Sequence, residues 1–181
     1  MGFFSIIFGT RHERVGYQLY SQVVRIARDP AWFEMLGVSD TLDGRFDLVG
    51  LFAALLIRRL RRLPPPGAAI AQAVFDAMFS DMDFNLRELG VGDMSIGKRM
   101  RAMWEAFHGR ALAYDGPLDE GDISALAVAL GRNVWRGSAP PGAADRLARA
   151  AQLQGQHLES IPLASFQAGM VAFLPAQSVL E

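Results

Sequence analysis

The amino-acid sequence predicts an all-α protein, a single-domain irregular bundle of about seven to eight helices. Apolar residues recur at spacings of three and four through most of the chain, which is the period of a helix with one buried face. No segment alternates strictly between apolar and polar residues, as a half-buried strand would. The chain has 181 residues, 51% hydrophobic and 20% charged, which suits one folded domain with a real core.

The individual helices follow from these stripes and from the breakers between them. Tyr20 and Val24 belong to the first stripe, and Asp29-Pro30 ends that helix. Segment 45–57 is apolar almost all round, which is typical of a helix at the centre of a bundle. Pro64-Pro65-Pro66 ends it. The predicted helices cover residues 15–28, 31–36, 45–63, 68–89, 93–114, 119–135 and 143–160, and a last apolar segment covers 162–174.

The first 14 residues are expected to form an apolar tail ahead of a helical domain at 15–176. They lack the basic start and the small-residue cleavage site of a signal peptide. Two interpretations remain: the tail packs on the core, or it lies in a membrane surface as a shallow anchor. In the second interpretation Phe3, Phe4, Ile7 and Phe8 contact lipid.

A cluster of four arginines, Arg58, Arg59, Arg61 and Arg62, also has two interpretations. It can be a solvated helix end, where cations offset the negative end of the helix dipole. It can also contact anionic lipid or RNA, with lipid favoured over RNA. The longest apolar stretch, 47–57, is too short to span a bilayer, which takes about 20 apolar residues.

Several chemistries are excluded or unsupported by the residues present. A net charge of −1 provides no global attraction to DNA or RNA, and the absence of cysteine removes thiolate sites. Segment 81–92 begins like a calcium loop but has Leu86 and Gly92 where glycine and glutamate are needed. Glu105 and His108 have the spacing of a di-iron motif without a second copy. With no nucleophile elbow or phosphate loop, we expect no catalytic residue, metal or cofactor.

The most informative segment is 75–114. On the helix at 68–89, acidic residues occupy one side and apolar residues the opposite side. If the next helix folds back antiparallel, Lys98, Arg99, Arg101 and Arg110 lie beside the acids. This can be an ordinary ion-pair network. Five of the eight methionines also fall here, and methionine adapts to varied apolar partners, so the second interpretation is a groove for a half-hydrophobic polypeptide.

Several blocks of the sequence are similar to a known family. They are Tyr20 with Ala27-Arg28, residues 37–47, Phe75-Asp76, residues 78–93, residues 107–110, Tyr114, and residues 132–135. Together they resemble the ubiquinol–cytochrome c chaperone family, across most of the domain. The chain departs from that family at His108, where an aromatic hydroxyl is common, and at Phe52, where a histidine is common.

The resemblance implies a bacterial assembly factor without enzymatic activity, acting in the cytoplasm and peripherally at the inner membrane. Its client would be newly made cytochrome b, for biogenesis of the ubiquinol–cytochrome c reductase (bc1) complex, with a second assembly factor as a further partner. Two alternatives stay open. One is a helical-bundle protein that binds haem or quinone, and the other is a scaffold that acts only through another assembly factor.

We expect the client site to lie on the helix at 68–89 and on the loops at 40–45 and 90–93. Gly44, Gly90 and Gly92 would allow a positive φ or a close backbone approach. Acids and arginines would orient the client, and methionines would supply apolar contact. The predicted client-binding residues are Asp40, Asp43, Arg45, Met78, Asp81, Met82, Asp83, Asn85, Arg87, Glu88, Asp93 and Arg110.

Overall fold

The computed structural model describes the backbone of residues 3–180 and the side chains of residues 12–92 and 94–180. This part of the chain contains helices and no strand, which confirms the all-α prediction. The helices are α1 (Phe3–Ala27), α2 (Pro30–Leu36), α3 (Leu42–Arg61), α4 (Gly67–Glu88), α5 (Asp93–Glu120), α6 (Ile123–Trp135), α7 (Ala143–Ser160), α8 (Leu163–Gln167) and α9 (Ala176–Leu180). None of them is long and apolar enough to cross a bilayer.

The central position predicted for the apolar helix is confirmed. Leu48, Leu51, Leu56 and Leu60 of α3 are almost fully buried, and α3 packs against α1, α4, α5, α6 and α7. A helix that is apolar on most sides must be surrounded in this way to remove its surface from water. The core therefore forms around α3.

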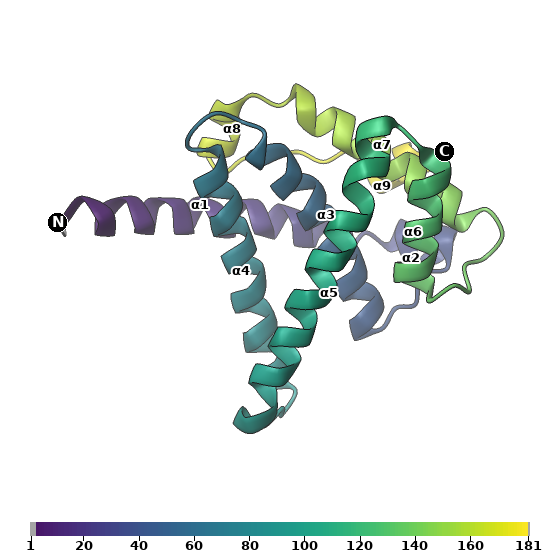
Figure 1. Ribbon diagram of the computed structural model, residues 1–181, viewed down its shortest axis with the longest axis horizontal. Coiled ribbons are helices and arrows are strands. Elements are labelled where there is room, and N and C mark those ends of the chain that lie inside the picture. The colour runs from purple at the N-terminus through teal and green to yellow at the C-terminus, as the bar shows by residue number, and fades with distance from the viewer. Residues whose placement is uncertain (1–2, 181) are drawn as a thin grey trace.

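Helix α1 begins much earlier than expected, at Phe3 rather than Val15. No proline interrupts residues 3–14, so nothing in the backbone ends the helix there. Its first turns project from the bundle, while its later part crosses α4 (Figure 1). At the crossing, a Cβ on Gly16 would lie 2.5 Å from the carbonyl carbon of Ala73, so glycine permits the close approach.

Side-chain caps define the short connections. Asp29 accepts a hydrogen bond from the Ala31 backbone N–H at the start of α2, and Thr41 accepts one from Gly44 at the start of α3. The Gly44 backbone lies so close to Ser39 that a Cβ would overlap the Ser39 carbonyl oxygen. The close approach predicted for this glycine is therefore present.

Helix α5 is longer than predicted, because it continues through Gly116-Pro117 to Glu120. Proline lacks a backbone N–H and therefore costs one helical hydrogen bond, and the helix continues for only three residues beyond it. The helix ends at Gly121, which has a φ of 68°. Asp122 then caps α6 by accepting a hydrogen bond from Ala125 N–H.

Helices α4 and α5 form an antiparallel hairpin whose tip extends away from the other helices (Figure 1). Gly90 ends α4 with a φ of 77°. Its N–H bonds to the Arg87 carbonyl, and the N–H of Val91 bonds to the Leu86 carbonyl, which is a Schellman ending. Gly92 has neither a positive φ nor any atom within 4 Å of an added Cβ, so the backbone role predicted for this glycine is wrong.

Candidate functional site

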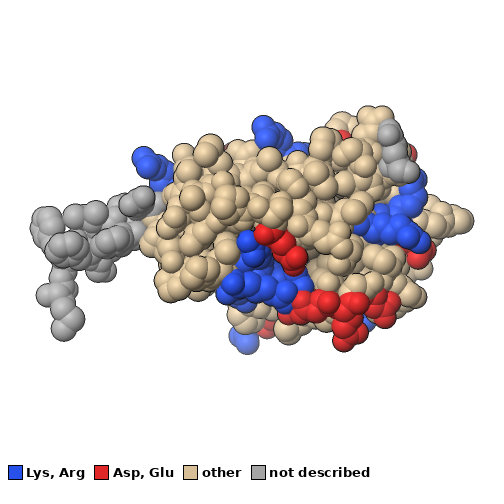
Figure 2. All heavy atoms as spheres, turned by 90° about the horizontal axis from the view of Figure 1, so that it is seen from above, with Lys and Arg blue, Asp and Glu red and all other residues tan. Residues whose placement is uncertain are grey.

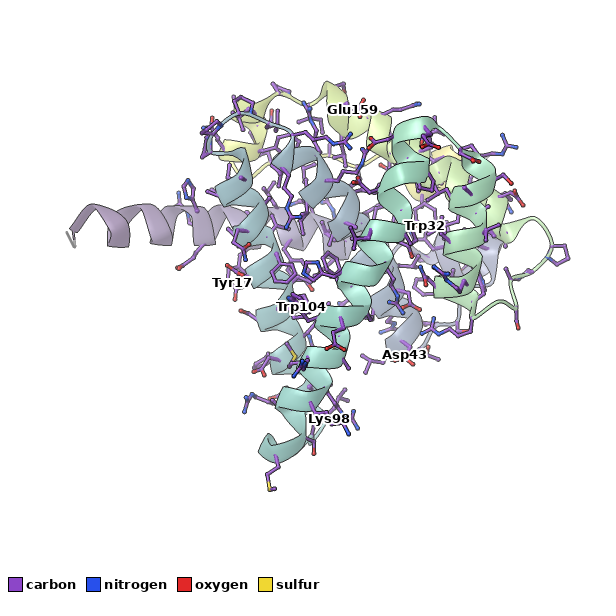
Figure 3. The ribbon with its side chains drawn as sticks, in the orientation of Figure 1. Tyr17, Trp32, Asp43, Lys98, Trp104 and Glu159 are labelled. Atoms are coloured by element: carbon purple, nitrogen blue, oxygen red, sulfur yellow. The ribbon has the colours of Figure 1, made fainter. Side chains whose placement is uncertain are left out.

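A cavity of about 550 Å³ opens between the hairpin and the rest of the bundle. We call it the hairpin cavity, and it is lined by the end of α1, the start of α3, the second half of α4, the first half of α5 and Arg136. Its apolar lining is Val24, Leu42, Phe46, Val49, Met82, Leu86, Leu89 and Met103. Leu42 and Leu89 are 57% and 62% exposed, so apolar surface continues from the cavity to its rim. Asp43 at the start of α3 and Lys98 near the hairpin tip are labelled in Figure 3.

One wall of the cavity is held by a hydrogen bond between α1 and α4. The buried Tyr20 hydroxyl donates to Asp81 Oδ2 at 2.7 Å. Burial, followed by the neighbouring carboxylate, raises the pKa of Tyr20, so the hydroxyl keeps its proton and remains a donor. Asp81 is thereby oriented within the cavity wall.

The opposite side is held by Asp47, which is 3% exposed. Its Oδ1 lies 2.5 Å from Arg110 Nη1, and its Oδ2 accepts a hydrogen bond from Arg136 Nη1. Burial raises the pKa of Asp47, and the two arginines act in the opposite direction. The Asp47–Arg110–Arg136 cluster therefore ties α3, α5 and the end of α6 together behind the cavity.

Two further contacts order the cationic side of the cavity. The Arg110 guanidinium lies 5.5 Å from the ring centroid of Phe46, within range of a cation–π interaction. At the rim, Arg45 Nε donates to Asp40 Oδ1 at 2.6 Å. This hydrogen bond lowers the pKa of Asp40, so the carboxylate stays charged beside Arg45.

The structure brings half of the predicted client-binding residues to this cavity. Those that line it are Asp43, Arg45, Asp81, Met82, Asn85 and Arg110, and Asp40 is joined to the rim through Arg45. Client contact remains a prediction for each of them.

The other predicted residues lie elsewhere. Met78 is 0% exposed, so its side chain packs the core and cannot contact a client. Asp83 pairs with Arg87 along α4 at 2.7 Å, and neither lines the cavity. Glu88 is exposed outside the cavity, and the side chain of Asp93 lies outside the described residues.

Sequence reasoning missed several lining residues on helices that it treated as structural. Tyr20 and Val24 of α1 and Arg28, which directly follows α1, line the cavity, and the spacing of four places Tyr20 and Val24 on one face of that helix. Arg136 also lines it, although the sequence suggested only a helix end there. The buried Asp47 had no signal of its own, because its two partners lie 63 and 89 positions away in the chain.

The arginine cluster of α3 does not form a free basic surface. Arg58 Nε donates to Asp115 at 2.8 Å, and both Arg58 and Arg62 bond to Asp119. Arg59 Nε donates to the Leu158 carbonyl at 3.0 Å. The view onto this end of the molecule shows arginines directly beside carboxylates (Figure 2). Arg58, Arg59 and Arg62 are bound by groups of α5 and α7, whereas Arg61 is exposed and Arg62 keeps 42% of its side-chain surface. Membrane contact by this cluster stays a prediction.

The residues predicted to contact lipid at the amino terminus, Phe3, Phe4, Ile7 and Phe8, lie outside the described side chains. Membrane contact by these four residues stays a prediction.

Helix α5 carries a second, aromatic surface on the side opposite to the cavity. Trp104, labelled on α5 in Figure 3, is 46% exposed. Its ring lies against that of His108, with centroids 4.2 Å apart and ring planes tilted by 54°. Phe75 of α4 lies 5.8 Å from the His108 ring. Leu112, one turn further, is 75% exposed. The two positions at which this chain departs from the family, His108 and Phe52, do not line the cavity. Phe52 is instead buried against Trp32.

Comparisons with known proteins agree with this arrangement. The family model described as "Ubiquinol-cytochrome C chaperone" matches residues 34–173, which include α3, α4, α5 and most of the cavity lining. The chain belongs to the ubiquinol–cytochrome c chaperone family. Its overall structure is similar to the crystal structure of the Cbp3 homolog from Brucella abortus, with a TM-score of 0.84 and 30% identity over 97% of this chain and 98% of that one.

A curated relative of this chaperone family member comes from Xenopus laevis, where it is named ubiquinol-cytochrome-c reductase complex assembly factor 1. The two are 27% identical over 106 residues, which make up 57% of this chain and 51% of the relative. The chain thus spans about half the length of that relative.

Proposed function

We propose that this ubiquinol–cytochrome c chaperone is an assembly factor for the bc1 complex, and that it binds newly made cytochrome b in the hairpin cavity. The single observation that carries the proposal is the cavity itself: an apolar lining, open to the surface, with acids and arginines at its rim. Family membership supports the assembly role, and the Xenopus laevis relative is named for assembly of ubiquinol-cytochrome-c reductase.

The chemistry of the cavity suits a segment of a membrane protein before it has met its partners. Such a segment is apolar, yet it carries polar groups that must be satisfied in the finished complex. Met82 and Met103 can adapt to an apolar surface, and Asp81 and Asn85 offer hydrogen-bonding groups beside them. We propose binding and release rather than catalysis, with the chain acting at the inner membrane where its client is made.

A second candidate function is a scaffold that works through another assembly factor. The observation that favours it is the aromatic surface of α5, where Trp104 and Leu112 are exposed without a covering element. A partner seated there would leave the hairpin cavity open, because the two surfaces lie on opposite sides of α5.

Site-specific photo-crosslinking in cells tests the proposal. A photoreactive amino acid at Ala102, which lines the cavity, is expected to capture cytochrome b. The same group at Val128, which is 73% exposed on α6, is the matched control and is expected to capture none. Ala106→Arg, which places a bulky charge within the lining, should abolish the Ala102 crosslink without loss of the folded protein. Capture from Trp104 but not from Ala102 would reject the cavity and favour the scaffold.

A further inference from the structure

We infer that the hairpin cavity recognises one turn of an apolar helix that carries an acidic side chain, bound through Arg28 and Arg99. This inference rests on the proposed function and specifies the chemical class of the bound segment. It follows from the size of the cavity, from its apolar lining and from which of its charged groups are already paired.

The size of the cavity matches a single helical turn. A helix with its side chains is about 10–12 Å across and rises about 5.4 Å per turn, so that one turn fills about 400–600 Å³. The cavity measures about 550 Å³. Most of a bound turn would contact Val24, Phe46, Met82, Leu86 and Met103, which favours an apolar helix face.

Most charged groups at the cavity already have partners within the protein. Arg45 is bound to Asp40, and Arg110 and Arg136 share the single carboxylate of Asp47. Asp81 accepts the hydrogen bond of Tyr20. These groups shape the cavity, but they have little capacity left for an incoming charge.

Arg28 and Arg99 are different. Both are exposed and line the cavity, and within the described part of the chain neither forms a hydrogen bond or an ion pair. Among the carboxylates that line the cavity, Asp43 also lacks a partner within the described residues. The cavity therefore has two unpaired arginines and one unpaired carboxylate. A carboxylate on the bound helix would supply the missing acceptor, since guanidinium–carboxylate pairs are among the stronger hydrogen-bonded contacts.

The test uses two fluorescent peptides that form the same apolar helix of about four turns and differ only in a central Glu or Gln. Their dissociation constants for the full chain are measured by anisotropy. We expect the Glu peptide to bind about fivefold to tenfold more tightly, as a charge-assisted hydrogen bond would provide. The preference should decrease at high salt, because the arginines are exposed.

Paired variants show whether the two arginines are responsible. Arg28→Gln and Arg99→Gln should remove the preference for the Glu peptide over the Gln peptide. Arg25→Gln, at an exposed position near the end of α1 and outside the cavity, should retain that preference. Equal binding of both peptides to the wild-type chain would overturn the inference but leave the proposed function standing. Binding of neither peptide would reject both, and tight binding of oleate in place of the peptides would assign the cavity to a lipid.

Discussion

At the scale of single residues, Asp47 is the acid on which the site depends most. It is buried, and it is shared between an arginine that lines the cavity from α5 and one that lines it from the end of α6. A buried carboxylate in this position is stabilised only while its cationic partners are present. The geometry of the cationic side of the cavity is therefore set by a residue that does not itself line the cavity.

Replacing Asp47 tests this dependence. Asp47→Ala leaves Arg110, which is 19% exposed, without its counter-charge, and we expect a loss of about 2–4 kcal/mol in the free energy of unfolding. Urea denaturation followed by circular dichroism measures it. Asp76→Ala is the matched control, because Asp76 is exposed and accepts one hydrogen bond from Gln72, so its change should stay within about 0.5 kcal/mol. Equal losses in the two variants would contradict the role of Asp47.

Sequence reasoning at this scale identified residue types more successfully than partners. Asp81 and Asn85 could be placed on one stripe of the helix from their spacing of four, and both line the cavity. Met78 was assigned to the same surface, but its position on the helix turns it into the core. The hydrogen bond between Tyr20 and Asp81 joins residues 61 positions apart, and no local pattern predicts such a pair.

At the scale of elements, the hairpin of α4 and α5 forms most of the candidate site. Its antiparallel arrangement was predictable from the two glycines that separate two helical stripes. Its ends were less predictable, because α5 continues through Pro117 where the sequence suggested a break. A proline near a helix end is compatible with either outcome, and here tertiary packing decides.

The two glycines of the hairpin turn are expected to differ sharply on substitution. Gly90→Ala forces a side chain into the left-handed region, although no atom lies within 4 Å of the added Cβ, and we expect a loss of about 1 kcal/mol in stability. Gly92→Ala has an ordinary extended φ of −63° and equal space, so the only cost is that alanine is a poorer N-cap of α5 than glycine, and the loss should stay within about 0.5 kcal/mol. Thermal unfolding of both variants measures the contrast, and an equal effect would show that φ is not the cause.

At the scale of the whole molecule, the ion pairs where α3, α5 and α7 meet link the bundle at the end away from the hairpin tip (Figures 1 and 2). Asp119 accepts hydrogen bonds from Arg62 and Arg58, and this holds the pKa of Asp119 below its usual value of 3.8. A lowered carboxyl pKa means that the folded state binds the proton less readily than the unfolded state. Its contribution to stability is therefore present above pH 3.8 and is lost as the pH falls through the lowered pKa.

Because folding lowers the pKa of Asp119, the difference in stability between the wild-type chain and Asp119→Asn should depend on pH. The variant should unfold at a lower temperature than the wild type at neutral pH, and the gap should shrink as the pH is lowered below about 4. Thermal unfolding at a series of pH values measures the gap. Glu120→Gln, an exposed neighbour on the same helix, should show a smaller gap, and a gap for Asp119→Asn that widens in acid would refute the assignment.

The global fold was accessible from the sequence because helical periodicity is a local signal repeated in every element. Segment 45–57 is apolar on nearly all sides, and that pattern alone placed α3 in the centre. The cavity was only partly accessible, since it is assembled from five separate parts of the chain. Arg28 and Arg136 resemble ordinary helix-end arginines, and only their positions in space assign them to the site.

The use of Arg136 to hold Asp47 has a consequence during synthesis. Ribosomes deliver Asp47 and most of the cavity lining long before the partner that lies 89 residues later. Until Arg136 has been synthesised, Asp47 lacks one of its two counter-charges, and the hairpin cavity lacks one of its lining residues. The hairpin cavity is therefore complete only once translation has passed α6.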